Sequence, residues 1–163
     1  MSVLPVYEFD GYRFRPATEN DVELARQWNR MDSEHTWEAQ YPDYWIEQNN
    51  QVNSYVLEDA IGVVFFVKSI RHMGGEIEIS LQFDRMRGMV SKTRVMGAMA
   101  AGFSWLKKAL PMNGFSTVYF VSKNQDLIVF AEKGLGFVKD GIRHVHKFVT
   151  EEVTDGKAHS KSA

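Results

Sequence analysis

Hydrophobic and polar positions recur with two different periods along this chain, and each change of period marks a predicted element. Residues 76–83 alternate strictly between polar and apolar, which predicts a strand with one polar and one apolar face. Residues 91–110 instead place apolar side chains three and four positions apart, which predicts a helix. The same two patterns predict further strands at 12–16, 54–57, 61–70, 117–121, 137–138 and 144–149, and further helices at 19–31, 42–48 and 126–133.

The order of these elements predicts the fold class. Three strands in succession, separated by turn residues at 58–59 and 74–75, indicate an antiparallel meander, whereas the strands on either side of the helix at 91–110 indicate a βαβ-like connection. We therefore expect an α+β fold (an α/β mixed sheet, mostly antiparallel) flanked by about four helices. We expect a single domain over residues 1–149, followed by a polar, disordered tail at 150–163.

Composition narrows the classes of function. The formal net charge of −2 over 163 residues gives no bulk attraction to nucleic acid or to an anionic membrane. The chain contains no cysteine, which excludes disulfides, zinc-thiolate sites and thiol nucleophiles. Its longest apolar run, residues 60–67, is much shorter than a membrane span, and its start lacks the pattern of an export signal. We expect a cytoplasmic protein that does not bind a membrane.

Motifs near both ends of the chain carry a family resemblance. Residues 130–137 read Phe-Ala-Glu-Lys-Gly-Leu-Gly-Phe, a helix end at which Gly134 or Gly136 can adopt the left-handed conformation. Together with Arg-Phe-Arg-Pro-Ala-Thr-Glu-Asn-Asp at 13–21 and with Asn124, this ending resembles the GNAT (N-acetyltransferase) superfamily over about residues 12–149. The ending is one residue longer than the common form and also looks like divergent GNAT-like proteins of tailed phages.

The resemblance implies where acetyl-coenzyme A would bind. In that family the fourth strand separates from the fifth, the acyl-coenzyme A enters the gap, and its pyrophosphate binds the loop that opens the following helix. Residues 85–93 occupy this place, although Val90 stands where the family pattern has a small residue. Backbone N–H groups and basic side chains at a helix N-terminus suit phosphate. The expected cofactor-binding residues are Phe83, Arg85, Arg87, Gly88, Met89, Val90, Ser91, Lys92, Asn124 and Phe130.

Amine acylation requires a base for the amine and an acid for the leaving thiolate. Because the family commonly carries its base on the fourth strand, Glu78 is the first candidate and Glu76 the second, although both also fit the solvated face of a sheet. The family often places a tyrosine acid on the last helix, where this chain has Ala131. Tyr119 on the predicted fifth strand is the substitute, unless its ring packs into the core.

Two further groups of residues suggest binding sites. An aromatic and acidic segment at 32–50 would suit a cationic amine, so Trp37, Tyr41 and Tyr44 are expected to bind the acceptor, unless they only pack helices. His144 and His146 share one face of a predicted strand and are metal-ligand types, but no third ligand is suggested nearby. We therefore expect an ordinary strand face there and no metal.

Three functions compete at this stage. The first is an acyl-coenzyme A-dependent N-acyltransferase that acts on a small-molecule or protein amine. The second is a catalytically inactive GNAT-fold module with a binding or structural role, for example associated with a phage. The third, nucleic-acid binding through basic residues in 85–94, is disfavoured because no aromatic residues are interleaved with them. The resemblance also allows a homodimer.

Overall fold

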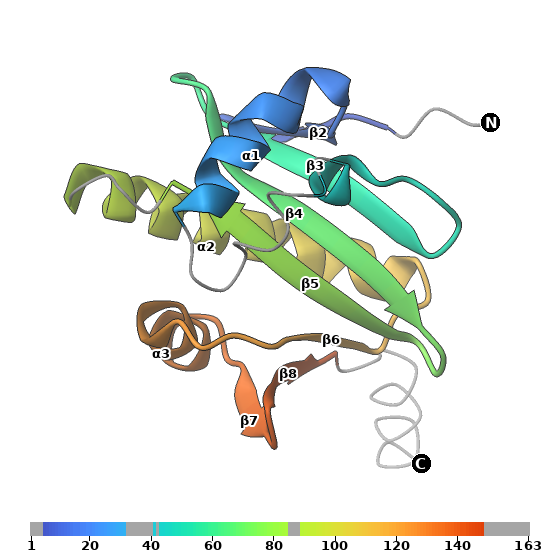
Figure 1. Ribbon diagram of the computed structural model, residues 1–163. Coiled ribbons are helices and arrows are strands. Elements are labelled where there is room, and N and C mark those ends of the chain that lie inside the picture. The colour runs from blue at the N-terminus through green and yellow to red at the C-terminus, as the bar shows by residue number, and fades with distance from the viewer. Residues whose placement is uncertain (1–4, 32–40, 42, 85–88, 149–163) are drawn as a thin grey trace, which may run out of the picture.

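Eight strands form one mixed sheet in the computed structural model, which describes residues 5–31, 41, 43–84 and 89–148. The strand order is β1-β2-β3-β4-β5-β6-β8-β7 (Figure 1). All neighbours are antiparallel except the central pair β5 and β6, which is parallel. The strands are β1 (Tyr7–Phe9), β2 (Tyr12–Pro16), β3 (Val52–Glu58), β4 (Val63–His72), β5 (Glu76–Phe83), β6 (Thr117–Phe120), β7 (Val138–Asp140) and β8 (Arg143–Lys147).

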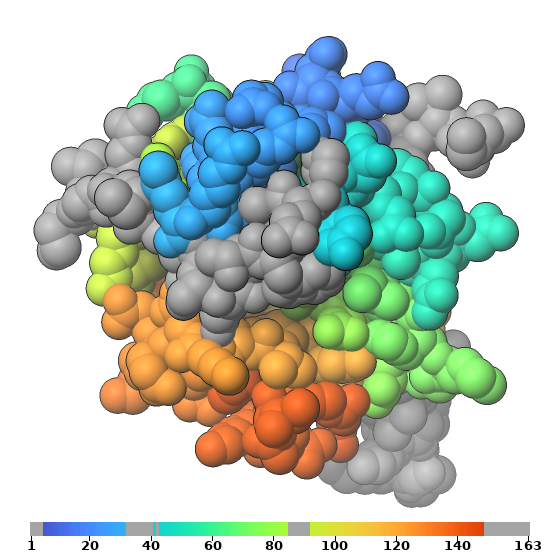
Figure 2. All heavy atoms as spheres, viewed as in Figure 1, coloured from blue at the N-terminus to red at the C-terminus, as the bar shows by residue number. Residues whose placement is uncertain are grey.

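Three α-helices within these described residues cover the two faces of the sheet: α1 (Val22–Arg30), α2 (Met89–Met112) and α3 (Gln125–Gly134). Figure 1 shows α1 on one face and α2 on the other, with α3 beside β6. In the same view of all atoms, α1 and the first strands form one end of the surface and β7 and β8 form the other (Figure 2). No helix in the described part of the chain is long and apolar enough to cross a membrane.

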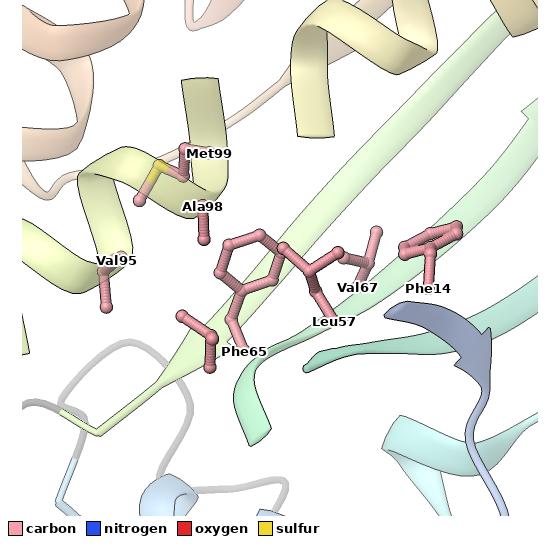
Figure 3. Packing of buried hydrophobic residues seen from close by; sticks show 8 residues of the cluster. Phe14, Leu57, Phe65, Val67, Val95, Ala98 and Met99 are labelled. Atoms are coloured by element: carbon pink, nitrogen blue, oxygen red, sulfur yellow. The ribbon is translucent and has the colours of Figure 1, made fainter. Parts of the chain in front are cut away.

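The two faces of the sheet have separate cores, as the alternation of β5 predicted. Under α2, Phe65 and Met99 belong to one apolar layer (Figure 3), and the apolar side chains of β5 pack against it. Under α1, Trp28 and Phe66 pack together, and Gln82 from the polar face of β5 donates a hydrogen bond of 2.8 Å to Asn29 Oδ1. The polar face of β5 is therefore partly buried by α1 and remains partly accessible beyond it.

The predicted α+β class, the meander and the parallel crossover are confirmed, with differences in detail. Three α-helices lie in the described residues rather than about four, because the segment expected to be helical at 42–48 forms a single 3-10 turn at Tyr44–Ile46. Strand β1 was not predicted, since three residues are too few to show a period. Helix α2 continues through Pro111, which was expected to lie beyond its end. The predicted tail at 150–163 lies outside the described residues.

The helix end at 130–137 shows why two glycines are present. Gly136 has a φ of +79°, so it is the glycine that takes the left-handed conformation. Gly134 instead remains in α3, where an added β-carbon would lie 3.3 Å from the Phe130 ring. The first glycine therefore leaves room for an aromatic side chain, and the second turns the chain toward β7.

Candidate active site

The central feature of the site is the separation of β5 from β6. The two strands pair over only three positions, of which the last is Glu78 with Tyr119. Strand β5 then continues to Phe83 paired with β4 alone. A parallel pair that separates in this way leaves backbone groups of β5 facing a cleft rather than another strand. This is the gap that the family resemblance implied, and the two predicted catalytic side chains lie where it begins.

A groove of about 740 Å³ lies beside the end of β5, between the N-terminal half of α2 and the length of α3. Four of the expected cofactor-binding residues line it: Phe83, Lys92, Asn124 and Phe130. Lys92 Nζ lies 3.1 Å from Asp126 Oδ2, so an ion pair joins the first turns of the two helices. Asn124 Oδ1 accepts a hydrogen bond of 3.2 Å from Leu127 N and thereby caps α3.

The remaining expected cofactor-binding residues belong to the segment that joins β5 to α2 and to the first turn of α2. Arg85, Arg87 and Gly88 lie outside the described residues. The backbone of Met89, Val90 and Ser91 forms the first turn of α2, and their side chains are likewise outside the description. The assignment of these six residues to cofactor binding stays a prediction.

Glu78 is the meeting point of three elements. Its Oε1 atom lies 2.9 Å from His72 Nε2 on β4 and accepts a hydrogen bond of 3.4 Å from the Tyr119 hydroxyl on β6. The His72 ring also stacks on the Tyr119 ring, with the centroids 5.9 Å apart. The register explains this grouping, because Glu78 is opposite Tyr119 in the parallel pair and diagonal to His72 in the hairpin.

Tyr119 has the surroundings of a protonated phenol. Burial raises its pKa, and the adjacent Glu78 carboxylate raises it further, whereas Arg143 lowers it. The side chain is 9% exposed, and its hydroxyl nevertheless reaches the glutamate rather than the apolar core. The alternative in which Tyr119 only packs the core is therefore wrong for its hydroxyl, which is available as a proton donor near neutral pH.

Arg143 on β8 completes the cluster. Its guanidinium carbon lies 4.5 Å from the centroid of the Tyr119 ring, and its Nη1 atom lies 3.3 Å from Glu76 Oε1. Glu76 is therefore engaged by a cation of its own chain, while Glu78 is in contact with His72 and Tyr119. This difference favours Glu78 over Glu76 as the base.

Sequence reasoning did not find His72 and Arg143. Each is a basic residue near a turn, and its contacts depend on strand register: that of the β4–β5 hairpin for His72, and that between β6 and β8 for Arg143. Because residues 74–75 form the turn of a hairpin, a comparison of diagonal neighbours on its two strands would have paired His72 with Glu78. No signal in the sequence would have brought Arg143 to Tyr119.

The segment expected to bind the acceptor is described only in part. Trp37 lies outside the described residues, whereas Tyr41 is 59% exposed and lines a shallow hollow with Tyr44 and Glu47. Lys68 Nζ lies 3.3 Å from the centroid of the Tyr44 ring and 2.9 Å from Glu47 Oε1. One face of Tyr44 is thus covered by a cation of the chain itself. Its role in acceptor binding, like that of Tyr41 and Trp37, stays a prediction.

The histidine pair on β8 faces the other side of the sheet. His144 stacks on Phe120 at 5.0 Å, and His146 packs edge-on against Phe103 at 5.1 Å. Burial lowers the pKa of His146, and so does Lys107. Among the residues whose positions the structure gives, no three His, Asp or Glu side chains converge on a point where a metal ion would bind.

Comparisons with known proteins identify the fold. No protein-family model matches the sequence, and no curated protein is significantly similar to it. An aminoglycoside 6′-acetyltransferase type Ii superimposes with a TM-score of 0.63 and 17% identity over 91% of this chain and 99% of its own. A spermidine N-acetyltransferase chimera from Vibrio cholerae and hSSAT superimposes with a TM-score of 0.61 and 14% identity, over 85% of this chain and 96% of its own. A ribosomal-protein-S5-alanine acetyltransferase from Vibrio fischeri superimposes with a TM-score of 0.57 and 17% identity, over 88% of this chain and 96% of its own.

Proposed function

We propose that this chain, which has the fold of the GNAT acetyltransferases, is an acyl-coenzyme A-dependent N-acyltransferase with acetyl-coenzyme A as its simplest donor. The observation that carries the proposal is the position of the Glu78–Tyr119 contact, at the point where β5 and β6 separate. A base and an acid at the inner end of a cleft suit a reaction between two substrates that approach from opposite faces of the sheet.

The groove between α2 and α3 has the features needed to hold coenzyme A. The groove reaches the N-terminal part of α2, and the first N–H groups of a helix have no acceptor within the helix itself; Lys92 adds a positive charge there. The cleft beyond the groove exposes the edge of β5 past its last pairing with β6, which suits a pantetheine arm with amide groups. When bound, the thioester would supply an acyl carbon activated toward attack by an amine.

Glu78 and Tyr119, where β5 and β6 separate, would together accept and supply the protons that move in the reaction. The amine nitrogen bonds to the acyl carbon and its proton passes to Glu78, while the carbon–sulfur bond breaks and the Tyr119 hydroxyl protonates the departing thiolate. Because the Tyr119 hydroxyl and Glu78 Oε1 are 3.4 Å apart, the proton taken up by Glu78 can return to Tyr119. The products are an amide and the free thiol, and both residues regain their starting protonation.

The acceptor in this proposal is a primary amine of a small molecule or of a protein. Spermidine, an aminoglycoside and a ribosomal protein appear in the names of enzymes with this fold. The negative charge of Glu78 beside the cleft would attract an acceptor that arrives as an ammonium ion, which releases one proton to solvent before the neutral amine attacks.

One observation favours the inactive-module alternative. Ala131 stands where the family often has its tyrosine acid, and it is 1% exposed within the core formed by α3, β6 and Phe137. If Tyr119 does not replace that acid, the fold would retain a cofactor groove without efficient turnover.

Calorimetric titration with acetyl-coenzyme A, followed by an acetylation assay with a panel of primary amines, separates the two functions. Micromolar binding and turnover are expected from the enzyme, with turnover of Glu78→Gln about 100-fold to 10,000-fold lower at unchanged cofactor affinity. Glu23→Gln is the matched control, because Glu23 is exposed on α1 and pairs with Arg26. Wild-type turnover in Glu78→Gln would remove the base assignment, and absence of binding at millimolar ligand would favour the inactive module.

A further inference from the structure

A cavity of about 120 Å³ lies between α2 and the sheet, beyond the cleft in which the thioester would be held. Its lining is mostly apolar and comes from strands on both sides of β5. At one end are Tyr119 and Ser122 beside the separated strands, and at the other are Phe14 and Trp105. Natural cores rarely leave a space of this size unfilled, since a cavity forfeits contacts that the surrounding side chains would otherwise make.

The cavity adjoins the groove assigned to the cofactor. Met99 from α2 and Leu127 from α3 line both spaces, so these two side chains stand between the groove and the cavity. Ile79 and Ser80 line the cavity on β5, immediately after the last residue paired with β6. A molecule held in the cleft therefore has apolar space ahead of it, on the α2 face of the sheet.

Gly102 provides an independent sign that the space is retained. It lies within α2 and lines the cavity, and a β-carbon added there would meet no atom within 4 Å. Glycine inside a helix is less favourable than alanine, so packing against a neighbour would be the usual reason to keep it. No neighbour approaches here. Figure 3 shows the nearby wall, where Met99 and Ala98 of α2 lie over Phe65 and the layer continues through Leu57 to Phe14.

We propose that this cavity binds the hydrocarbon tail of the acyl donor, so that the chain prefers a linear acyl group longer than acetyl. The inference rests on the proposed function, because it assigns the tail of a thioester held in the cleft. The charged and polar groups of the donor remain in the groove, and only methylene groups would enter the space lined by Phe14, Met99 and Trp105.

The size of the cavity sets the expected length of the acyl chain. An apolar protein cavity of roughly 150 Å³ holds benzene, a molecule of six carbons. A cavity of 120 Å³ lined by similar side chains therefore suits an acyl group of about four to six carbons, including the carbonyl carbon at the cleft. Each methylene group that is buried should tighten binding about fourfold.

The first test compares free coenzyme A with its acetyl, butanoyl, hexanoyl and decanoyl thioesters by calorimetry on the wild-type chain. Butanoyl-coenzyme A is expected to bind about 15-fold tighter than acetyl-coenzyme A, with no further gain between hexanoyl and decanoyl. Equal binding of all four thioesters would overturn the tail site while leaving the proposed function intact. Failure of every ligand, free coenzyme A included, would instead overturn the proposed function.

The second test fills the cavity from α2 with Gly102→Leu. Its expected effect is that the ratio of butanoyl to acetyl affinity falls from about 15 to near 1. Gly97→Leu is the matched control, since Gly97 is an exposed position on the same helix, and there the ratio should not change. Retention of the wild-type ratio in Gly102→Leu would contradict the assignment. If that variant does not fold, the comparison of thioesters on the wild-type chain decides alone.

Discussion

Replacing Asp59 with asparagine tests how firmly the first turns of α2 are held to the sheet. Asp59 lies in the turn between β3 and β4, and its two carboxylate oxygens are 2.6 Å and 2.7 Å from Arg94 Nε and Nη2 on α2. It also accepts hydrogen bonds from the backbone N–H groups of Ile61 and Gly62. Arg94 in turn donates to the Gly62 carbonyl at 3.0 Å. This contact anchors the helix whose N-terminal part lines the groove proposed for the cofactor.

The size of the effect follows from the pKa of Asp59. The hydrogen bond from Arg94 lowers that pKa from 3.8 to about 2, with smaller help from Ile61 and Gly62. Both side chains are less than one-third exposed, at 19% and 25%, so solvent screens the pair only in part. The shift corresponds to about 2 kcal/mol of folding free energy at neutral pH. Because the folded pKa is below the unfolded one, this stability is present above pH 3.8 and is lost as the pH falls toward 2.

Urea unfolding of the wild type and of Asp59→Asn at pH 7 and pH 3 measures this contribution. The variant is expected to be less stable by about 2 kcal/mol at pH 7 and by about half as much at pH 3, where part of the wild-type advantage has already been lost. Arg94→Met in the same series should show the same pH dependence, and the double variant should cost little more than either single one. An equal loss at both pH values would refute the electrostatic reasoning and leave only the neutral hydrogen bonds of the turn.

Two more substitutions test the site itself. His72→Phe keeps an aromatic ring beside Tyr119 but removes the contact of Nε2 with Glu78. We expect kcat to fall about tenfold while the Kd for acetyl-coenzyme A stays unchanged. An unaltered kcat would show that this contact does not position the base. Asp126→Asn removes the ion-pair partner of Lys92 and so leaves the ammonium group available to the phosphates of the cofactor. Calorimetry should show acetyl-coenzyme A binding about twofold to fivefold tighter at low salt, with a smaller gain at about 0.5 M salt. Weaker binding would exclude this role for Lys92.

Local periodicity predicted most of the elements and the two faces of β5, because both depend on neighbouring residues. The alternation from Glu76 to Phe83 predicted the strand to the residue, and the apolar spacing predicted α2 to within two residues at each end. The separation of β5 from β6 could not be derived in this way. It depends on how far two strands remain paired across a helical connection, so only the family resemblance implied it.

Sequence reasoning predicted the site residues that could be chosen from a single strand, and it missed those whose contacts depend on the register between strands. Glu78 and Tyr119 were expected separately, and the structure brings them together. His72 joins them from β4 through the register of the hairpin at residues 74–75, and Arg143 joins them from β8 through a pairing that no local pattern encodes. The short helix expected from Pro42 onward is a single turn, because Trp45 is drawn inward to donate its Nε1–H to Asn29 at 2.9 Å. Tertiary contacts outweighed the helical propensity there.

The alanine at position 131 bears directly on the choice between an enzyme and an inactive module. Its carbonyl accepts hydrogen bonds from the N–H groups of both Leu135 and Phe137, and its side chain is enclosed by the same core. Ala131 also lines the cavity between α2 and the sheet, so a tyrosine at this point of α3 would occupy that space. Tyr119 instead reaches the cleft from β6, already in contact with the proposed base. The missing tyrosine is therefore weak support for inactivity, and the decision between the two functions depends on whether the groove at Lys92 binds coenzyme A.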